Sequence, residues 1–396
     1  MDIYYQSKKF KRLLQRYEEL RDNNISEFLD SEDLTDVAEY YYSIGQDEKA
    51  LETANYTNHL YPTATAPLAF KARMALLTYN NPTLANEIAE TIVDKSDLDY
   101  LYLKAEIMIA DNQVSKADQY LQEQYDNVID EDDHEEFAID AAALFADYEE
   151  IDYAEKWLNQ STMINEDEYK EIKVRILKGQ GKYEASETLI NELIDGNPYS
   201  CAYWNQLTQI QFLRNDVQGA ITSSEYALAI NPNDEEALLN KANGLFSLDN
   251  FVESLKYYQQ YRQTCHHVDF SIIDVTIGHL YLILGHPKEA LDFYFQSITE
   301  SENKDQELIN VAISIFDNGY FELTYRILIN YLPNAEKDWT EGFAYLARCC
   351  YELKKTEKYK QFLQIAIERN PRECQDVLSD LYPPGTDIKD YPSINI

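Results

Sequence analysis

Small side chains and helix-ending residues recur about every 34 residues, and this recurrence restricts the fold more than any other feature. In the segment 220–246, AITSSEYALAINPNDEEALLNKANGLF, one apolar run ends at Asn231-Pro232 and another begins a few residues later. The residue before a proline avoids the helical region, and Asn233 and Asp234 are suitable caps for a following helix. The segment therefore predicts two helices joined by a short turn.

The same pattern returns along most of the chain, in ten candidate repeats between residues 31 and 371. The eighth position of the repeats reads Ala38, Ala72, Ala105, Ala142, Lys173, Thr208, Ala242, Gly278, Ala312 and Ala347. The twentieth position reads Ala50, Leu84, Ala117, Ala154, Ala185, Ala220, Ser254, Ala290, Thr324 and Tyr359. Small residues are needed where two helices cross, because large side chains would hold the backbones apart. The second repeat needs an insertion near TYNNPT, and the fifth places Lys173 where a small residue is wanted.

The period, the small residues and the helix-closing proline resemble the tetratricopeptide repeat (TPR), in the form of bacterial arrays without attached catalytic domains. The resemblance implies an all-α fold, an α-α superhelix of about ten helix-turn-helix units in one continuous domain. We expect an N-terminal capping helix in residues 1–30 and the TPR array in residues 31–371. Residues 372–396 are expected to form a C-terminal capping helix and an extended tail.

The charge of the chain restricts its partners. The formal net charge is -37, from 71 acidic and 34 basic residues. Such a field repels phosphate backbones and anionic lipids, and it attracts a basic partner. The sequence therefore predicts a protein or peptide partner, a basic one being favoured by the charge, with no nucleic acid and no membrane insertion.

The expected location is the cytoplasm. Five cysteines without the spacing of a disulfide framework favour a reducing compartment. The first residues lack the apolar core of a signal peptide, and no run comes near 18 apolar residues.

Motifs for catalysis or metal binding are weak or missing, and no cofactor is expected. His266 and His267 are adjacent, so on a helix they would point about 100° apart and would need a loop to converge. The acidic segment 129–137 lacks the glycine of a calcium loop and is interpreted as the start of a helix. Many of the 33 tyrosines are attributed to helix packing.

The TPR resemblance also implies which residues line a concave binding groove. The candidate groove residues are Tyr42, Arg73, Tyr102, Lys170, Asn205, Gln209, Asn243, His279, Ile309, Ile313, Phe316 and Arg348. The polar middle of this set suits an extended peptide, and the apolar stretch from Ile272 to Phe316 suits an amphipathic helix or the chain's own tail. The carboxylate clamp of chaperone-binding TPR domains is not assembled, because Ile272 and Thr276 occupy positions where cations are required.

The predicted function is that of a non-catalytic scaffold or adaptor, which binds a peptide or helix of a partner protein in the groove. A regulatory, peptide-sensing TPR module is one alternative, and a metal-dependent enzyme is an alternative from another class. The sequence leaves open whether the chain is a monomer or a weak homodimer.

Overall fold

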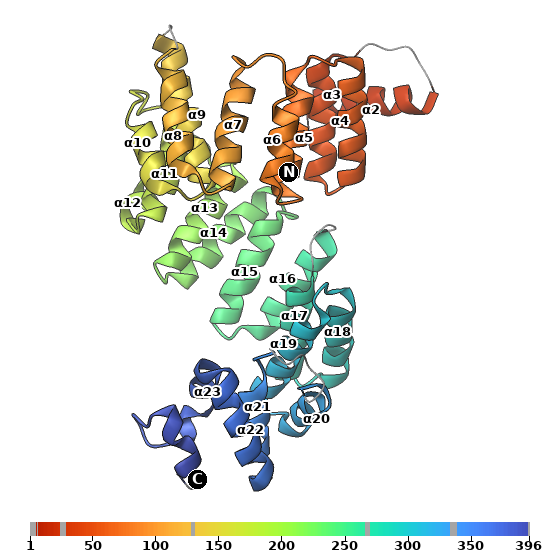
Figure 1. Cartoon of the computed structure of the whole chain (residues 1–396), viewed down its shortest axis with the longest axis vertical. Coiled ribbons are helices and arrows are strands. Elements are labelled where there is room, and N and C mark those ends of the chain that lie inside the picture. Colours follow the sequence, from red (N-terminus) through yellow and green to blue (C-terminus); the bar gives the residue numbers. More distant parts are fainter. Residues whose placement is uncertain are drawn as a thin grey trace. The chain divides into compact units, whose positions relative to one another are not determined.

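The computed structural model describes residues 5, 7–23, 29–127, 131–265, 270–332 and 339–394. Every regular element within these residues is a helix. Twenty of the helices pair into ten successive hairpins (Figure 1). The prediction of an all-α fold with about ten helix-turn-helix units is therefore confirmed.

The chain divides into two compact units, residues 1–232 and 233–396, and each is described by itself. The first unit contains α2 (Lys8–Asn23) and six hairpins. These hairpins are α3 (Ser31–Ser43) with α4 (Asp47–Leu60), α5 (Thr65–Leu77) with α6 (Pro82–Ala89), α7 (Leu98–Ala110) with α8 (Val114–Tyr125), α9 (Glu131–Asp147) with α10 (Ile151–Leu158), α11 (Asp167–Gly179) with α12 (Tyr183–Gly196), and α13 (Cys201–Leu213) with α14 (Val217–Ile230).

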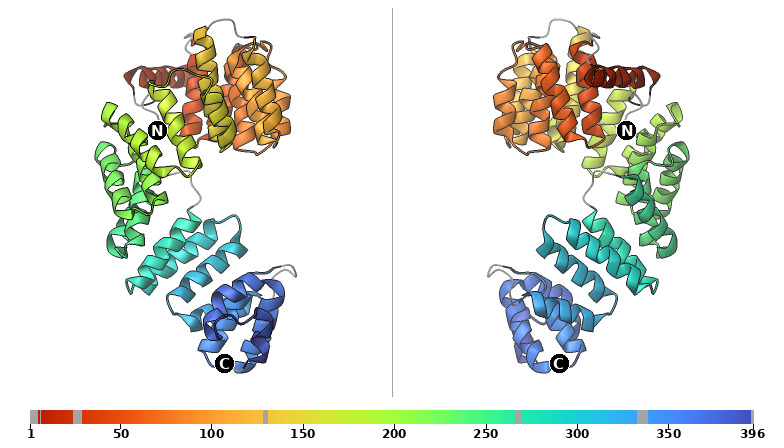
Figure 2. Two further views of the ribbon diagram at one scale, coloured as in Figure 1. Left: turned by 90° about the vertical axis from the view of Figure 1, so that its left-hand side faces the viewer. Right: turned by 90° about the vertical axis from the view of Figure 1, so that its right-hand side faces the viewer.

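The second unit contains four hairpins and a short C-terminal segment, and neighbouring hairpins lie side by side in both further views (Figure 2). The hairpins are α15 (Glu235–Ser247) with α16 (Phe251–Thr264), α17 (Ser271–Ile283) with α18 (Pro287–Glu300), α19 (Lys304–Asp317) with α20 (Phe321–Tyr331), and α21 (Phe343–Glu352) with α22 (Thr356–Arg369). The C-terminal segment consists of α23 (Pro371–Leu378) and the 3-10 helices η2 (Ser379–Leu381) and η3 (Ile388–Ser393).

The helix ends predicted around Asn231-Pro232 are confirmed. Helix α14 ends at Ile230, and α15 begins at Glu235. The carboxylate of Asp234 accepts a hydrogen bond of 3.0 Å from the backbone N–H of Ala237, so it caps α15.

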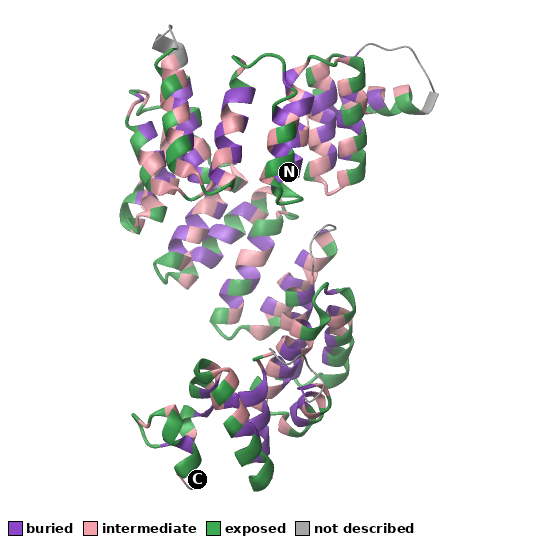
Figure 3. Cartoon of the chain, viewed as in Figure 1, coloured by how far each residue is buried: buried purple, intermediate pink, exposed green. Residues whose placement is uncertain are grey.

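The small residues of the eighth position lie where the two helices of a hairpin cross, and they form part of the buried surface between helices (Figure 3). In three hairpins a hydroxyl of the second helix donates to a carbonyl of the first. Ser186 donates to Val174, Ser254 to Ala242 and Thr324 to Ala312, over 2.9, 2.9 and 3.5 Å. The backbones come close enough for this bond because both crossing positions are small or β-branched.

These contacts correct the register of two repeats. In the fifth, Val174 is 1% exposed and lies at the crossing, whereas Lys173 pairs with Glu155 at 3.0 Å. In the second, Ala85 is fully buried and Leu84 is exposed, because the turn after α5 holds one extra residue. The small residues at these crossings are therefore Ser186 and Ala85, one position after those expected.

A feature not expected from the sequence marks the turn inside each of the ten hairpins: one residue with a positive φ angle. These residues are Gly45, Asn80, Asn112, Glu149, Gly181, Asn215, Asp249, Gly285, Gly319 and Lys354. The left-handed region favours Gly and, next, Asn and Asp, which accounts for eight of the ten.

Both ends of the array are covered by additional helices. Phe10 of α2 is fully buried, and the hydroxyl of Tyr17 lies 2.9 Å from that of Thr53 on α4. At the other end α23 packs on α21 and α22. The tail expected to be extended instead contains η3, whose Tyr391 is buried against Tyr382.

Candidate functional site

The first unit contains a pocket of about 820 Å³ between three first helices, α5, α7 and α9. We call it the acidic pocket, because five carboxylates and one cation line it. Its residues are Arg73, Leu77, Asp97, Leu98, Asp99, Tyr102, Glu106, Asp140, Ala143, Leu144, Asp147 and Tyr148.

Two of the five carboxylates are already paired with cations. Arg73 Nε donates to Glu106 Oε2 over 3.1 Å, and Arg175 Nη2 donates to Asp147 Oδ1 over 2.6 Å. Tyr148 donates a further hydrogen bond to the same glutamate, over 3.3 Å. The pairs reduce the negative charge of the pocket without removing it.

The other three carboxylates form no ion pair with any residue that the structure describes. Asp97 caps α7 by accepting from the N–H of Asp99, over 3.0 Å. Partial burial raises the pKa of Asp140, Tyr102 opposes the rise, and the carboxylates of Glu136 and Glu168 add to it. A carboxylate surrounded by like charges gains from a cation. The pocket is therefore an anionic hollow that suits a positively charged group.

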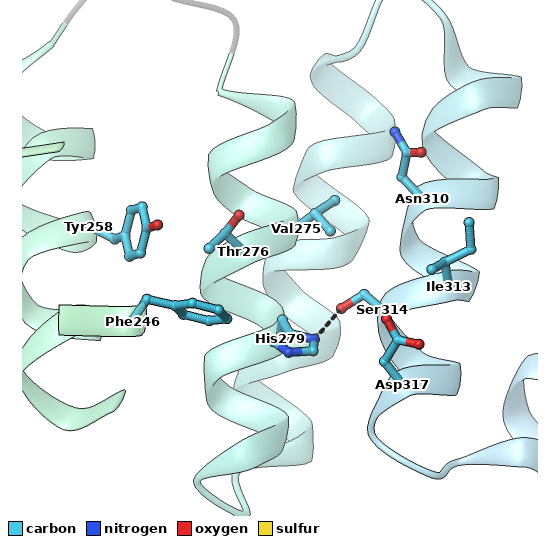
Figure 4. A pocket seen from close by; sticks show the side chains of 9 residues that line it. All are labelled: Phe246, Tyr258, Val275, Thr276, His279, Asn310, Ile313, Ser314 and Asp317. Carbon is cyan, nitrogen blue, oxygen red and sulfur yellow. Dashed lines mark hydrogen bonds between the residues drawn. The ribbon is translucent and has the colours of Figure 1, made fainter. Parts of the chain in front are cut away.

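The second unit contains a smaller pocket of about 410 Å³, called here the histidine pocket (Figure 4). Its residues come from α15, α16, α17 and α19: Phe246, Tyr258, Val275, Thr276, His279, Asn310, Ile313, Ser314 and Asp317. Phe246 and Ile313 supply apolar walls, and the ring centroid of Phe246 lies 6.0 Å from that of His279. The pocket combines an apolar wall with a polar end.

The tautomer of His279 follows from its neighbours. Asn318 Nδ2 donates to the carbonyl of Ser314 over 2.9 Å, which fixes the orientation of the amide. The same Nδ2 lies 2.9 Å from His279 Nδ1. The hydroxyl oxygen of Ser314 lies 3.1 Å from the same ring nitrogen. The hydrogen bond to Asn318 therefore assigns Nδ1 as the acceptor, which places the proton of the neutral ring on Nε2. Burial lowers the pKa of His279 and so favours this neutral form.

The structure gathers four of the predicted groove residues into these pockets, namely Arg73 and Tyr102 in the first unit, and His279 and Ile313 in the second. Asn243 lies beside the histidine pocket, since its Oδ1 accepts from the hydroxyl of Tyr258.

Other predicted groove residues interact outside the two pockets. Tyr42 packs edge-on against Phe70, with the ring centroids 6.0 Å apart. Lys170 lies 3.8 Å from Glu192, and Gln209 accepts a hydrogen bond of 2.7 Å from Lys178. Phe316 packs against Phe321 and Tyr345.

Three predictions of groove residues need correction. Ile309 is fully buried and packs in the core with Leu328 and Phe343, so a partner does not reach it. Asn205 is only 4% exposed, because it lies within the packed face of α13. Arg348 donates to the carbonyl of Val377 and to Asp380, so it holds the C-terminal segment.

The carboxylates of the acidic pocket were missed in the sequence, although they carry a signal. Asp99, Tyr102 and Glu106 recur at helical spacing, as do Asp140 and Asp147 on the next first helix. Such spacing places side chains on one helix face. The two neighbouring helix faces together indicate an acidic surface.

Two further expectations concern metal binding and the membrane. Among the described residues, no group of three or more His, Cys, Asp or Glu side chains could hold a metal ion. His266 and His267 lie outside the described residues. No described helix is both long and apolar enough to cross a bilayer.

The hairpins and their small-residue crossings define the fold as an α-helical repeat array of the tetratricopeptide type. No protein-family model matches the sequence. No curated protein matches it either.

Several solved structures resemble the chain. One is YrrB, titled a TPR protein with an unusual peptide-binding site, at 13% identity and a TM-score of 0.36, covering 49% of this chain and 98% of YrrB. Another is PilF of Pseudomonas aeruginosa, at 13% identity and a TM-score of 0.40, covering 54% and 98%. The APC/C hetero-tetramer Cut9-Hcn1 matches at 13% identity and a TM-score of 0.37, covering 95% and 88%.

Proposed function

We propose that this chain is a non-catalytic protein-interaction scaffold that binds a basic segment of a partner protein in the acidic pocket. The observation that carries the proposal is the set of three carboxylates, Asp97, Asp99 and Asp140, for which no cationic partner is found in the described residues. Lys or Arg side chains of a partner would supply the missing charge.

The apolar residues of the acidic pocket support the same class of ligand. Leu77 and Leu98 are exposed large apolar side chains at this pocket. Lys and Arg place their aliphatic stems on apolar surface and their charged ends on carboxylates. A segment with spaced basic side chains uses both kinds of contact, and the cytoplasm is the proposed location because the odd number of cysteines favours a reducing compartment.

The test must separate the pocket from the general attraction of a chain with a net charge of -37. We would measure binding of a fluorescein-labelled Ala-Lys octapeptide by anisotropy. The test variant is Asp99→Asn with Asp140→Asn. The control is Glu123→Gln on α8 with Asp126→Asn at the C-cap of that helix. Each variant removes two carboxylates that no described cation pairs, so the net charge changes equally.

We expect the test variant to weaken peptide binding about tenfold and the control to change it less than twofold. A direct ion pair in the pocket binds the peptide more strongly than the screened attraction of a distant carboxylate. A matched Ala-Glu octapeptide should show no binding. Equal weakening by both variants would assign the binding to net charge and would overturn the proposed site.

A further inference from the structure

We propose that the histidine pocket binds the side chain of a tyrosine from a partner protein. The proposal concerns a different unit and a different chemistry from the acidic pocket, so it does not depend on the proposed function. It follows from the hydrogen-bonding groups that the pocket offers and from the shape of its walls.

The walls suit a flat ring. Phe246, Val275 and Ile313 line the pocket with an aromatic face and two branched aliphatic side chains (Figure 4). Aromatic rings gain from edge or offset contacts with such a ring in addition to the buried apolar area. The volume of about 410 Å³ is large enough for one aromatic side chain and small for a folded element.

At the polar end, His279 supplies a donor and Asp317 an acceptor. His279 Nδ1 is occupied by Asn318 and Ser314, so Nε2–H is the donor that remains on the ring. Asp317 lines the same pocket, and its carboxyl group supplies the acceptor. Burial raises the pKa of Asp317, and His279 opposes this rise. Burial lowers the pKa of His279, and the charge of Asp317 opposes this lowering. No hydrogen bond or ion pair joins the two residues within the described part of the chain.

A phenol hydroxyl matches both groups in kind, because it can accept a hydrogen bond from Nε2–H and donate one to the carboxylate. Arginine and lysine side chains carry only hydrogen-bond donors, so they cannot accept the hydrogen bond that Nε2–H of His279 offers. A carboxylate is repelled by Asp317. Phenylalanine contacts the apolar wall but leaves both polar groups without a hydrogen-bond partner. Binding it therefore loses two hydrogen bonds and also costs the desolvation of the two groups.

The experiment uses the full chain and three probes that differ in one residue, N-acetyl-Gly-Tyr-Gly-amide and its Phe and Arg counterparts. Affinities are measured by saturation-transfer NMR titration. The variants are Asp317→Asn, and Asp292→Asn as a matched control on α18. Both aspartates are exposed, so neither substitution disturbs the core.

We expect the tyrosine probe to bind about tenfold more tightly than the phenylalanine probe, as for a pair of hydrogen bonds that includes a charged acceptor. In Asp317→Asn this preference should fall to about twofold, and in Asp292→Asn it should persist. Equal affinity of the tyrosine and phenylalanine probes, tighter binding of the arginine probe, or no measurable binding of the tyrosine probe at its solubility limit would each overturn the proposal.

Discussion

The ring of Tyr294 lies directly against Gly278, so that a Cβ on the glycine would come within 2.5 Å of the ring atom Cε1. Gly278 is the eighth residue of its repeat, and Tyr294 belongs to the second helix of the same hairpin. The ring is 2% exposed and its hydroxyl lies 2.7 Å from that of Ser314, so it has little freedom to move. The small residue is therefore required by a specific side chain at this crossing.

Replacing Gly278 by alanine should destabilise the second unit by about 1–3 kcal/mol, as for other overpacked cores. Gly196→Ala is the matched control, since Gly196 ends α12, and nothing lies within 4 Å of its added Cβ. We expect the control to be neutral or slightly stabilising. Urea denaturation of both variants measures the difference, and equal midpoints would contradict the packing argument.

The corrected register of the fifth repeat predicts opposite sensitivities for two adjacent residues. Val174→Asp should destabilise the first unit by about 3 kcal/mol or more, because it buries a charge with no partner. Lys173→Ala removes only the partly exposed pair with Glu155 and should cost less than about 1 kcal/mol. Thermal unfolding of the two variants tests the register, and a reversed order would restore Lys173 to the crossing.

The left-handed turns predict a stabilising substitution. Glu149 and Lys354 are the two turn residues that are neither Gly, Asn nor Asp, and both are exposed. Lys354→Gly should raise stability by about 0.5–1 kcal/mol, because glycine adopts a positive φ without steric cost. Lys360→Gly, in the interior of α22, should lower stability by about 1 kcal/mol. The same sign for both glycine substitutions would refute this explanation.

Glu373 connects the C-terminal segment to the start of α21. Its two carboxylate oxygens accept from the backbone N–H groups of Gly342 and Ala344, over 2.8 and 3.1 Å. Glu373→Gln places an amide donor against one of these N–H groups, so we expect a loss of about 1–3 kcal/mol in the second unit. Glu368→Gln, an exposed residue on α22, is the control. Denaturant unfolding should separate the two variants. Indistinguishable curves would show that the two hydrogen bonds of Glu373 contribute nothing to stability.

The neutral form of His279 predicts a pH dependence of stability. Burial lowers its pKa, and Asp317 and the backbone of Ser314, both on α19, oppose this effect. The folded state then holds fewer protons than the unfolded state, so the contribution of His279 is lost as the pH falls below about 6.5. Tyr258 on α16 and Tyr294 on α18 do not titrate in this range, because burial raises the pKa of each to about 12.

The measurement compares the native chain with His279→Gln between about pH 5 and pH 7.5, the range in which an ordinary histidine titrates. The native chain should lose more unfolding free energy on acidification than the variant. A parallel decline of the two curves would show that other groups account for the pH dependence.

The sequence by itself determined the helical hairpins and their number. Each helix end depends on near neighbours, as at Asn231-Pro232, and small residues at a fixed period mark where helices cross. These are local constraints, which one sequence displays without any knowledge of distant contacts.

Only the tertiary structure decided which side chains are buried and which are accessible. A shift of one residue turns a side chain by about 100° around its helix, and this separates Val174 from Lys173. Neighbouring helices likewise bury Ile309 and bring Asp99 and Asp140 into one pocket. Burial and charge density arise from groups far apart in the sequence, so the binding sites depend on packing that no single repeat contains.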